Sequence, residues 1–250
     1  MYLPQYVTGI HLEKTLPEDS YFAKLPVVQN LQKQGSLEFT EDITFLVGEN
    51  STGKSTLLEG IAIALGFNPE GGTKNFCFST EDTHASLYQY LRVPRRQHFQ
   101  DGFFLRAESF YNVATNIDQM DREPSFAPKV IQSYGGVSLH RQSHGESFLA
   151  LIQNRFGGNG LYLLDEPEAA LSPDNLLVLM RQIHLLLQKK SQFIIATHSP
   201  MLLTFPGAQV IELTEDAIQT KDYRETRHYQ LVKAFLEQPE TYFHHLFSDL

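Results

Sequence analysis

The sequence lacks the features that direct a chain to a membrane or stabilise it in an oxidising compartment. Its single cysteine, Cys77, cannot form an internal disulfide. No apolar run approaches the roughly 20 residues that a membrane-spanning helix needs, and the N-terminus shows no basic segment followed by an apolar one. We therefore expect a cytoplasmic protein that does not insert into a membrane.

Basic residues are scarce as well. The 20 lysines and arginines stand against 29 acidic residues, which gives a formal net charge of −9 at pH 7. This balance argues against a broadly basic nucleic-acid surface but allows a local patch. One local cluster consists of Arg92, Arg95, Arg96 and His98. It could contact phosphate groups of nucleic acid or of a nucleotide, although such clusters are more often solvated faces.

Internal repeats, low-complexity tracts and an obvious interdomain linker are absent too. The 250 residues, of which 42% are hydrophobic, can bury one large α/β core. We therefore expect a single domain over residues 1–250. A small inserted lobe and a helical region are expected within residues 68–142.

What the sequence does contain is a phosphate-binding loop. Residues 48–55, Gly-Glu-Asn-Ser-Thr-Gly-Lys-Ser, have the form G-x-x-x-x-G-K-[ST] and lie between a predicted strand over 43–47 and a helical pattern over 56–65. In such a loop backbone N–H groups surround the β-phosphate, Lys54 supplies positive charge, and Ser55 offers a hydroxyl to Mg²⁺. We expect a nucleoside triphosphate to contact Gly48, Asn50, Ser51, Thr52, Gly53, Lys54, Ser55 and Thr56.

Two carboxylates follow another apolar strand, predicted over 161–164. Asp165 and Glu166 come directly after it. A phosphate-loop ATPase has its Mg²⁺-side carboxylate and its water-activating carboxylate at such a strand end, so we expect Asp165 near the metal and Glu166 as the general base. A further strand over 193–196 leads to His198, expected beside the γ-phosphate; a single histidine at a strand end is otherwise a common polar residue.

Strands and helices alternate through the second half of the chain. Helices are predicted over 147–156 and 174–190, and a strand over 103–106 joins those already named. This alternation predicts an α/β fold with a largely parallel core sheet flanked by helices, and a nucleotide at the C-terminal ends of its strands.

The ends of the chain have other patterns. Short strands over 7–12 and 37–39, separated by a Pro-broken segment, predict an antiparallel β side element. Residues 68–98 are irregular, with a helical pattern over 84–91. The C-terminal run 229–247 has Leu, Phe and Tyr at helical spacing, which indicates core cover or a partner-docking helix. Its two adjacent histidines lack the ligand spacing of a metal site.

Four motifs, in order, resemble those of the ATP-binding-cassette (ABC) ATPases and cover nearly the whole chain. They are the phosphate loop, Gln-Ser-His-Gly-Glu at 142–146, Leu-Leu-Asp-Glu-Pro-Glu at 163–168 and Ala-Thr-His-Ser-Pro at 196–200. The resemblance implies that Ser143, Gly145 and Glu146 form the family's signature motif, which binds the γ-phosphate held by the opposite protomer. By itself this element would be an ordinary helix cap. The resemblance also implies an ATP-dependent, head-to-tail homodimer that hydrolysis loosens.

Within that class, residues 163–173 and 196–200 are more similar to the SMC, RecF and OLD-like ATPases than to transporter subunits. Two positions depart from the group's pattern. Ser51 replaces the usual glycine of the phosphate loop, and Glu108 takes the position of a glutamine that contacts Mg²⁺, so the resemblance implies Glu108 as a third metal residue. No heptad run provides a coiled-coil arm, and too few residues follow His198 for a nuclease domain.

The implied function is that of an ATPase, with ATP and Mg²⁺, that switches between a closed dimer and separated protomers. DNA maintenance or phage defence is the expected setting, with nucleic acid or a separately encoded effector as partner. Two alternatives stay open at this point: the nucleotide-binding subunit of a membrane transporter, and an ATP-gated scaffold with negligible turnover.

Overall fold

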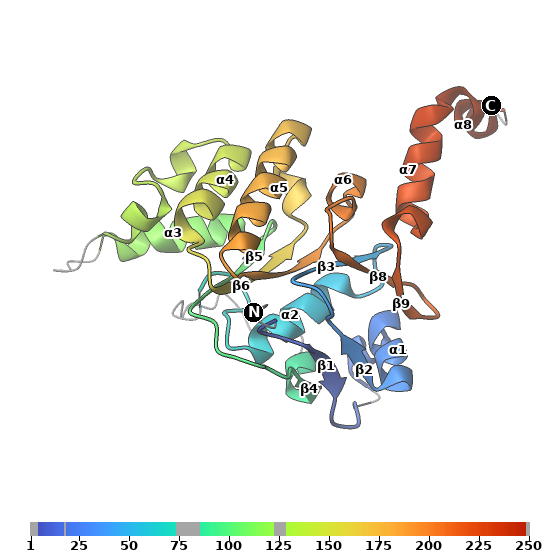
Figure 1. Cartoon of the computed structure of the whole chain (residues 1–250), viewed down its shortest axis with the longest axis horizontal. Coiled ribbons are helices and arrows are strands. Elements are labelled where there is room, and N and C mark those ends of the chain that lie inside the picture. The colour runs from blue at the N-terminus through green and yellow to red at the C-terminus, as the bar shows by residue number, and fades with distance from the viewer. Residues whose placement is uncertain (1–4, 18, 74–85, 123–128, 249–250) are drawn as a thin grey trace.

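The computed structural model describes residues 5–17, 19–73, 86–122 and 129–248 (Figure 1). Its central sheet has six strands in the order β5-β6-β7-β3-β8-β9, all parallel to their neighbours except β9, which is antiparallel to β8. These strands are β3 (Ile43–Gly48), β5 (Asp101–Arg106), β6 (Gly160–Asp165), β7 (Gln192–Ala196), β8 (Gln209–Leu213) and β9 (Ile218–Lys221).

The centre of the sheet is made of apolar runs. Every residue of β6 and of β7 is buried, as expected for parallel strands covered on both faces. The register pairs Asp165 with Ala196, and Ala196 with Leu46. The three strands β6, β7 and β3 therefore end at the same edge of the sheet.

Helices cover both faces of this sheet (Figure 1). Apolar side chains of α1 and α2 share one core with the side chains on one face, and those of α3, α4 and α5 share a second core with the other face. The helices are α1 (Pro26–Gln34), α2 (Lys54–Ala64), α3 (Phe110–Met120), α4 (His144–Arg155), α5 (Pro173–Gln188), α6 (Pro200–Leu203), α7 (Arg227–Glu237) and α8 (Pro239–Phe247). Short 3-10 helices span Tyr21–Lys24, Ser86–Tyr90, Val130–Tyr134, Leu139–Arg141, Pro167–Ala170 and Tyr223–Glu225.

A smaller, antiparallel sheet lies beside α2. It has three strands in the order β2-β1-β4, which are β1 (Gly9–Leu12), β2 (Ser36–Glu38) and β4 (Leu91–Arg92). Gly60 on α2 lies close to the side chains of Leu91 and Leu87. A Cβ atom added to Gly60 would come within 3.0 Å of Leu91. The predicted side element is thus confirmed, and it packs on the helix that follows the phosphate loop.

The expected α/β architecture is confirmed, with corrections in two segments. The Pro-broken segment between the first two strands contains the helix α1, whose first residue is Pro26; proline favours that position because its missing N–H has no helical partner there. No bounds were predicted for the helix α3, which buries Phe110, Val113 and Ile117. Cys77 and the start of the helix expected over 84–91 lie outside the described residues.

The C-terminal helices do not cover the core. Neither α7 nor α8 buries a residue, and Figure 1 shows both projecting from the sheet. Core cover is therefore the wrong interpretation of the apolar run 229–247. Large apolar side chains of this arm, including Leu231, Leu236 and Leu246, are exposed.

The basic cluster lies on the surface. Arg92, Arg95, Arg96 and His98 are all exposed, and Arg92 pairs with Glu13 at 3.1 Å.

Among the described residues, no helix is both long enough and apolar enough to span a bilayer.

Candidate functional site

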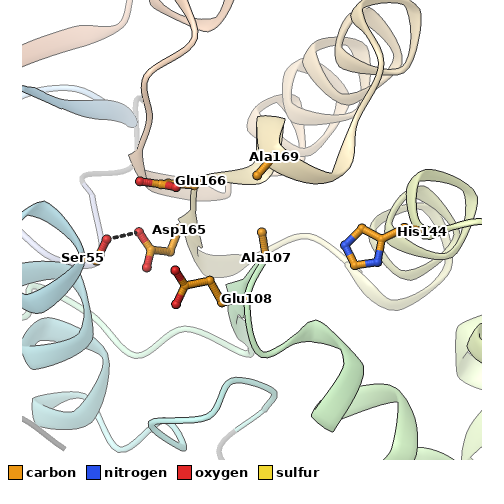
Figure 2. Close-up of a pocket in the computed structure, with 7 residues that line it drawn as sticks. All are labelled: Ser55, Ala107, Glu108, His144, Asp165, Glu166 and Ala169. Atoms are coloured by element: carbon orange, nitrogen blue, oxygen red, sulfur yellow. Dashed lines mark hydrogen bonds between the residues drawn. The ribbon is translucent and has the colours of Figure 1, made fainter. Parts of the chain in front are cut away.

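The C-terminal edge of the sheet brings the predicted site residues together. Ser55 Oγ, at the start of α2, donates a hydrogen bond of 2.9 Å to Asp165 Oδ1 at the end of β6. Figure 2 shows these two side chains and Glu108 pointing toward one another, with Glu166 close by. They line a pocket of about 210 Å³ whose wall consists of Ser55, Ala107, Glu108, His144, Asp165, Glu166 and Ala169.

The phosphate loop requires a glycine directly before α2. Gly53, just before α2, has φ +96°, and an added Cβ would lie 2.6 Å from Val27 Cγ1, so only glycine fits. Lys54 is buried, and its Nζ donates to the backbone oxygens of Gly48 at 2.9 Å and Glu49 at 3.0 Å. Burial lowers the pKa of Lys54 below its usual value, while nearby carboxylates oppose this shift. The two hydrogen bonds to backbone oxygens hold the Lys54 ammonium against the loop.

Ser51 departs from glycine at a position where the backbone favours glycine. Its φ is +69°, in the left-handed region that costs an ordinary residue roughly 1 kcal/mol. Its hydroxyl donates to the backbone oxygen of Asn50. The loop thus keeps its shape without the usual glycine, at some cost in backbone strain.

Asp165 is the most deeply buried carboxylate of the pocket. It is 6% exposed, and desolvation raises its pKa to about 6, although Arg106 and the hydroxyl of Ser55 both lower it. Arg106 Nε lies 3.5 Å from Asp165 Oδ2. Asp165 Oδ1 thus faces the hydroxyl of Ser55, and Asp165 Oδ2 faces the guanidinium of Arg106.

Glu166 and His198 face each other across the ends of β6 and β7. His198 Nε2 lies 3.3 Å from Glu166 Oε1, and burial together with the charge of Lys54 lowers the pKa of His198. Glu166 has φ 50° and ψ 51°, and its N–H donates to the backbone oxygen of Ala196 at 2.9 Å. The strained turn directs the carboxylate of Glu166 out of the strand and toward the pocket.

Sequence reasoning missed Glu168 as a positioning residue. Its Oε1 accepts a 2.7 Å hydrogen bond from Thr197 Oγ1 and another from the N–H of His198. This carboxylate therefore fixes the turn that carries His198. The signal in the sequence is a third acid just after Asp165 and Glu166.

Arg106 was missed as well. It pairs with Glu59 Oε2 at 2.8 Å, with Asp165, and with Glu108 Oε2 at 3.8 Å. Glu108 itself borders the pocket, but its side chain is 86% exposed. The sequence contains one sign of this role, since Arg106 is a charged residue at the end of an apolar strand. The parallel pairing of β5 with β6 places Arg106 opposite Asp165.

Ser143 lies at the exposed N-cap of α4. Its Oγ accepts from the N–H of Glu146, and Glu146 Oε2 accepts from the backbone N–H of Ser143 at 3.0 Å, so the capping box is complete. The Ser143 hydroxyl also donates to Glu146 Oε2 at 2.7 Å. These bonds with Ser143 lower the pKa of Glu146. An added Cβ on Gly145 would lie 3.1 Å from the backbone oxygen of Ala170, so the helix start packs closely on that loop. Ser143, His144 and Glu146 at this helix start are exposed.

The donor set suits Mg²⁺ bound together with phosphate oxygens. Ser55 and Asp165 provide a hydroxyl and a carboxylate oxygen 2.9 Å apart, and magnesium prefers such oxygen ligands. Within the described part of the chain, no group of three His, Cys, Asp or Glu side chains could hold a metal ion without further ligands. Magnesium sites of this sparse kind usually take their remaining ligands from the substrate's phosphates and from water.

Comparisons with known proteins agree with this geometry. Residues 26–113 match a family model described as "AAA domain", and residues 131–204 match one described as "AAA domain, putative AbiEii toxin, Type IV TA system". A nucleotide-free ATP-binding cassette from an ABC transporter superposes with a TM-score of 0.50 at 16% identity, over 94% of this chain and 96% of that one. Both family matches are to AAA domains, and the fold is that of an ATP-binding cassette.

Two further solved structures were compared with the chain. Another ATP-binding cassette of an ABC transporter, MJ1267, superposes with a TM-score of 0.50 at 15% identity, over 94% of this chain and 96% of that one. The SMC head domain from Thermotoga maritima gives a TM-score of 0.42 at 14% identity, over 87% of this chain and 98% of that one. No functionally curated protein matches the sequence.

The burial of Asp165 predicts a pH-dependent effect on stability. Because its folded pKa of about 6 exceeds the ordinary 3.8, stability falls as pH rises through this interval, and the loss is complete above pH 6. Asp165→Asn should therefore raise the free energy of unfolding of the nucleotide-free protein by about 2 to 3 kcal/mol at pH 8. Thermal melts in EDTA should show the gain shrinking by about half at pH 5.

The exposed Asp216→Asn serves as the control and should leave the melting temperature unchanged at both pH values. A loss of stability in Asp165→Asn at pH 8 would show that the ionised carboxylate is favoured by its surroundings, contrary to this assignment.

Proposed function

We propose that this chain binds and hydrolyses ATP as an ABC-type ATPase. The observation that carries the proposal is the meeting of Ser55, Asp165 and Glu166 at one pocket beside the phosphate loop, with His198 3.3 Å from Glu166. Three separate segments contribute these residues, and their chemistry is complementary: a hydroxyl and a carboxylate for a cation, a second carboxylate for water, and an imidazole. A turn that only connects two elements of the fold would not require these side chains to come together.

Each residue has a proposed role in the reaction. Lys54 and the N–H groups at the start of α2 would bind the β- and γ-phosphates, with Ser55 and Asp165 holding Mg²⁺. When bound, Mg²⁺ supplies neutralising charge to the phosphates. Glu166 would accept a proton from the attacking water, and His198, held by Glu168, would contact the γ-phosphate. Glu108 is proposed as a further metal-side carboxylate.

The proposed working unit is a head-to-tail homodimer. The exposed N-terminus of α4, with Ser143, would bind the γ-phosphate on the opposite protomer. Glu146 is part of the same cap, so the capping box would open or shift when a phosphate arrives. Hydrolysis would remove the ligand that joins the two chains and so loosen the pair.

Phage defence or DNA maintenance is the proposed setting. Support comes from the family model over residues 131–204, whose description names a toxin of a toxin–antitoxin system. A separately encoded effector or nucleic acid would then be the partner of the ATPase.

Glu166→Gln tests the proposed general base. The amide keeps the shape of the carboxylate but cannot accept the proton of water, so ATP affinity should persist while turnover falls by about 10² or more. Malachite-green release of phosphate measures turnover, and light scattering should show the variant accumulating as an ATP-bound dimer. Glu240→Gln on α8 is the matched control. Wild-type turnover in Glu166→Gln would remove this residue from the mechanism.

Ser143→Arg tests the proposed partner geometry. Added bulk at the α4 N-cap should leave ATP binding to a single chain largely intact but block ATP-dependent dimerisation, as measured by light scattering. Lys54→Ala, in contrast, should weaken ATP binding itself. A mixture of the two inactive variants should regain activity, because a heterodimer then has one site with both changes and one with neither.

The outcomes of the Ser143 experiment are separable. A normal ATP-dependent dimer of Ser143→Arg would contradict the signature assignment. Activity that stays absent although mass measurement shows heterodimers would contradict independent composite sites.

A further inference from the structure

Arg106, the last residue of β5, contacts acidic side chains from three different segments. Its Nη1 lies 2.8 Å from Glu59 Oε2 on α2, its Nε 3.5 Å from Asp165 Oδ2 at the end of β6, and its Nη2 3.8 Å from Glu108 Oε2. Glu108 is exposed, so the third contact is screened by water and contributes little. The Arg106 side chain is 21% exposed. The contacts with Glu59 and Asp165 are therefore the ones that the fold shields.

The carboxylate of Asp165 has a different partner on each oxygen. Oδ1 accepts the hydrogen bond from Ser55 Oγ, whereas Oδ2 faces Arg106 Nε. The strand pairing fixes this arrangement, because Arg106 and Asp165 are register partners and the N–H of Ala107 donates to the backbone oxygen of Asp165 at 3.2 Å. The last torsion of an aspartate side chain is soft. A bond to Oδ1 alone would let the carboxylate turn, so the contact at Oδ2 determines its orientation.

Glu59 holds the guanidinium at this position. Arg106 Nε is buried and has no hydrogen-bond partner among the described residues, and such a donor is costly by itself. The short bond from Nη1 to Glu59, a residue only 8% exposed, is the contact that keeps Arg106 there. Because Glu59 compensates the charge of Arg106, the pair adds little net charge beside Asp165.

The helix α2 is thus joined to β6 twice. Ser55 and Glu59 are four positions apart on α2, so they lie on the same face of the helix, one turn from each other. Ser55 reaches Asp165 Oδ1 directly, and Glu59 reaches Asp165 Oδ2 through Arg106. Mg²⁺ demands a nearly ideal arrangement of its oxygen ligands. Residues that orient a metal ligand without touching the metal commonly change metal affinity or activity by about 10- to 100-fold.

We propose that Arg106, held by Glu59, is a positioning residue for the magnesium site, because it fixes the carboxylate of Asp165 with Oδ1 toward Ser55. This inference rests on the proposed function, since it requires Mg²⁺ and ATP at the phosphate loop. Arg106 acts through Asp165 and contacts neither the metal nor the phosphates. The Glu59–Arg106 pair therefore determines how strongly Mg²⁺ increases the affinity for ATP.

The ratio of ATP affinities in Mg²⁺ and in EDTA measures this role. Calorimetry on the full chain should show that Arg106→Ala lowers the ratio about tenfold, because Asp165 is no longer oriented. The affinity in EDTA should stay within about twofold, because Lys54 and the loop still bind the phosphates. Glu59→Ala should lower the ratio as well. The double variant Arg106→Ala/Glu59→Ala should match Arg106→Ala alone, since Glu59 acts through Arg106.

Arg155→Ala is the matched control. Arg155 forms a 2.8 Å ion pair with Asp101, at the opposite end of β5, and its side chain is 25% exposed. Its loss should lower the melting temperature but leave the ratio of affinities unchanged. If a lone buried Glu59 prevents Arg106→Ala from folding, the double variant still gives the measurement, because it removes both charges of the pair.

The failures of the two proposals are distinguishable. Absence of ATP binding in the wild type, or equal affinities in Mg²⁺ and in EDTA, would overturn the proposed phosphate or metal site itself. An unchanged ratio in Arg106→Ala and in the double variant would overturn the positioning role alone. So would an increased ratio, which would show that the guanidinium opposes the metal as a like charge. An equal loss in Arg155→Ala would attribute the effect to a weakened fold and likewise overturn the role.

Discussion

Three parallel strands that end at one edge are the constraint on which the rest of the structure depends. The register of β3, β7 and β6 places Leu46, Ala196 and Asp165 side by side. Each strand then turns into a polar segment, and the hydrogen bond between Ser55 and Asp165 joins the first of these turns to the last. A shift of one register position would remove this bond and turn the buried faces of the strands toward the wrong layer.

Burial determines how the charges at that edge behave. Lys54, Asp165 and Glu59 are each less than one-tenth exposed, where an unpaired charge would be costly. Arg106 pairs with both carboxylates, and Lys54 is held by backbone oxygens. These contacts allow a dense set of charged groups at the edge, and a bound magnesium nucleotide would add both signs of charge to it. The exposed start of α4 lies beside this edge, where His144 lines the pocket.

The sequence predicted the centre of this molecule better than its periphery. Apolar runs fully buried on both faces give the clearest pattern, so the strands that carry the phosphate loop, Asp165 and His198 were located within one or two residues. The helix α1 was missed because Pro26 looks like a breaker, although it opens that helix. Arg106 became visible only through the strand pairing, and the contact of α7 with the loop joins residues far apart in the sequence. Spacing alone does not encode such contacts.

A crystal structure of the chain with Mg²⁺ and a non-hydrolysable ATP analogue tests the central claim most directly. The metal should be bound by Ser55 Oγ near Asp165, with the γ-phosphate facing Glu166 and His198. A triphosphate bound away from residues 48–55, or one turned so that its γ-phosphate points toward α7, would contradict the assignment of this edge as the catalytic site.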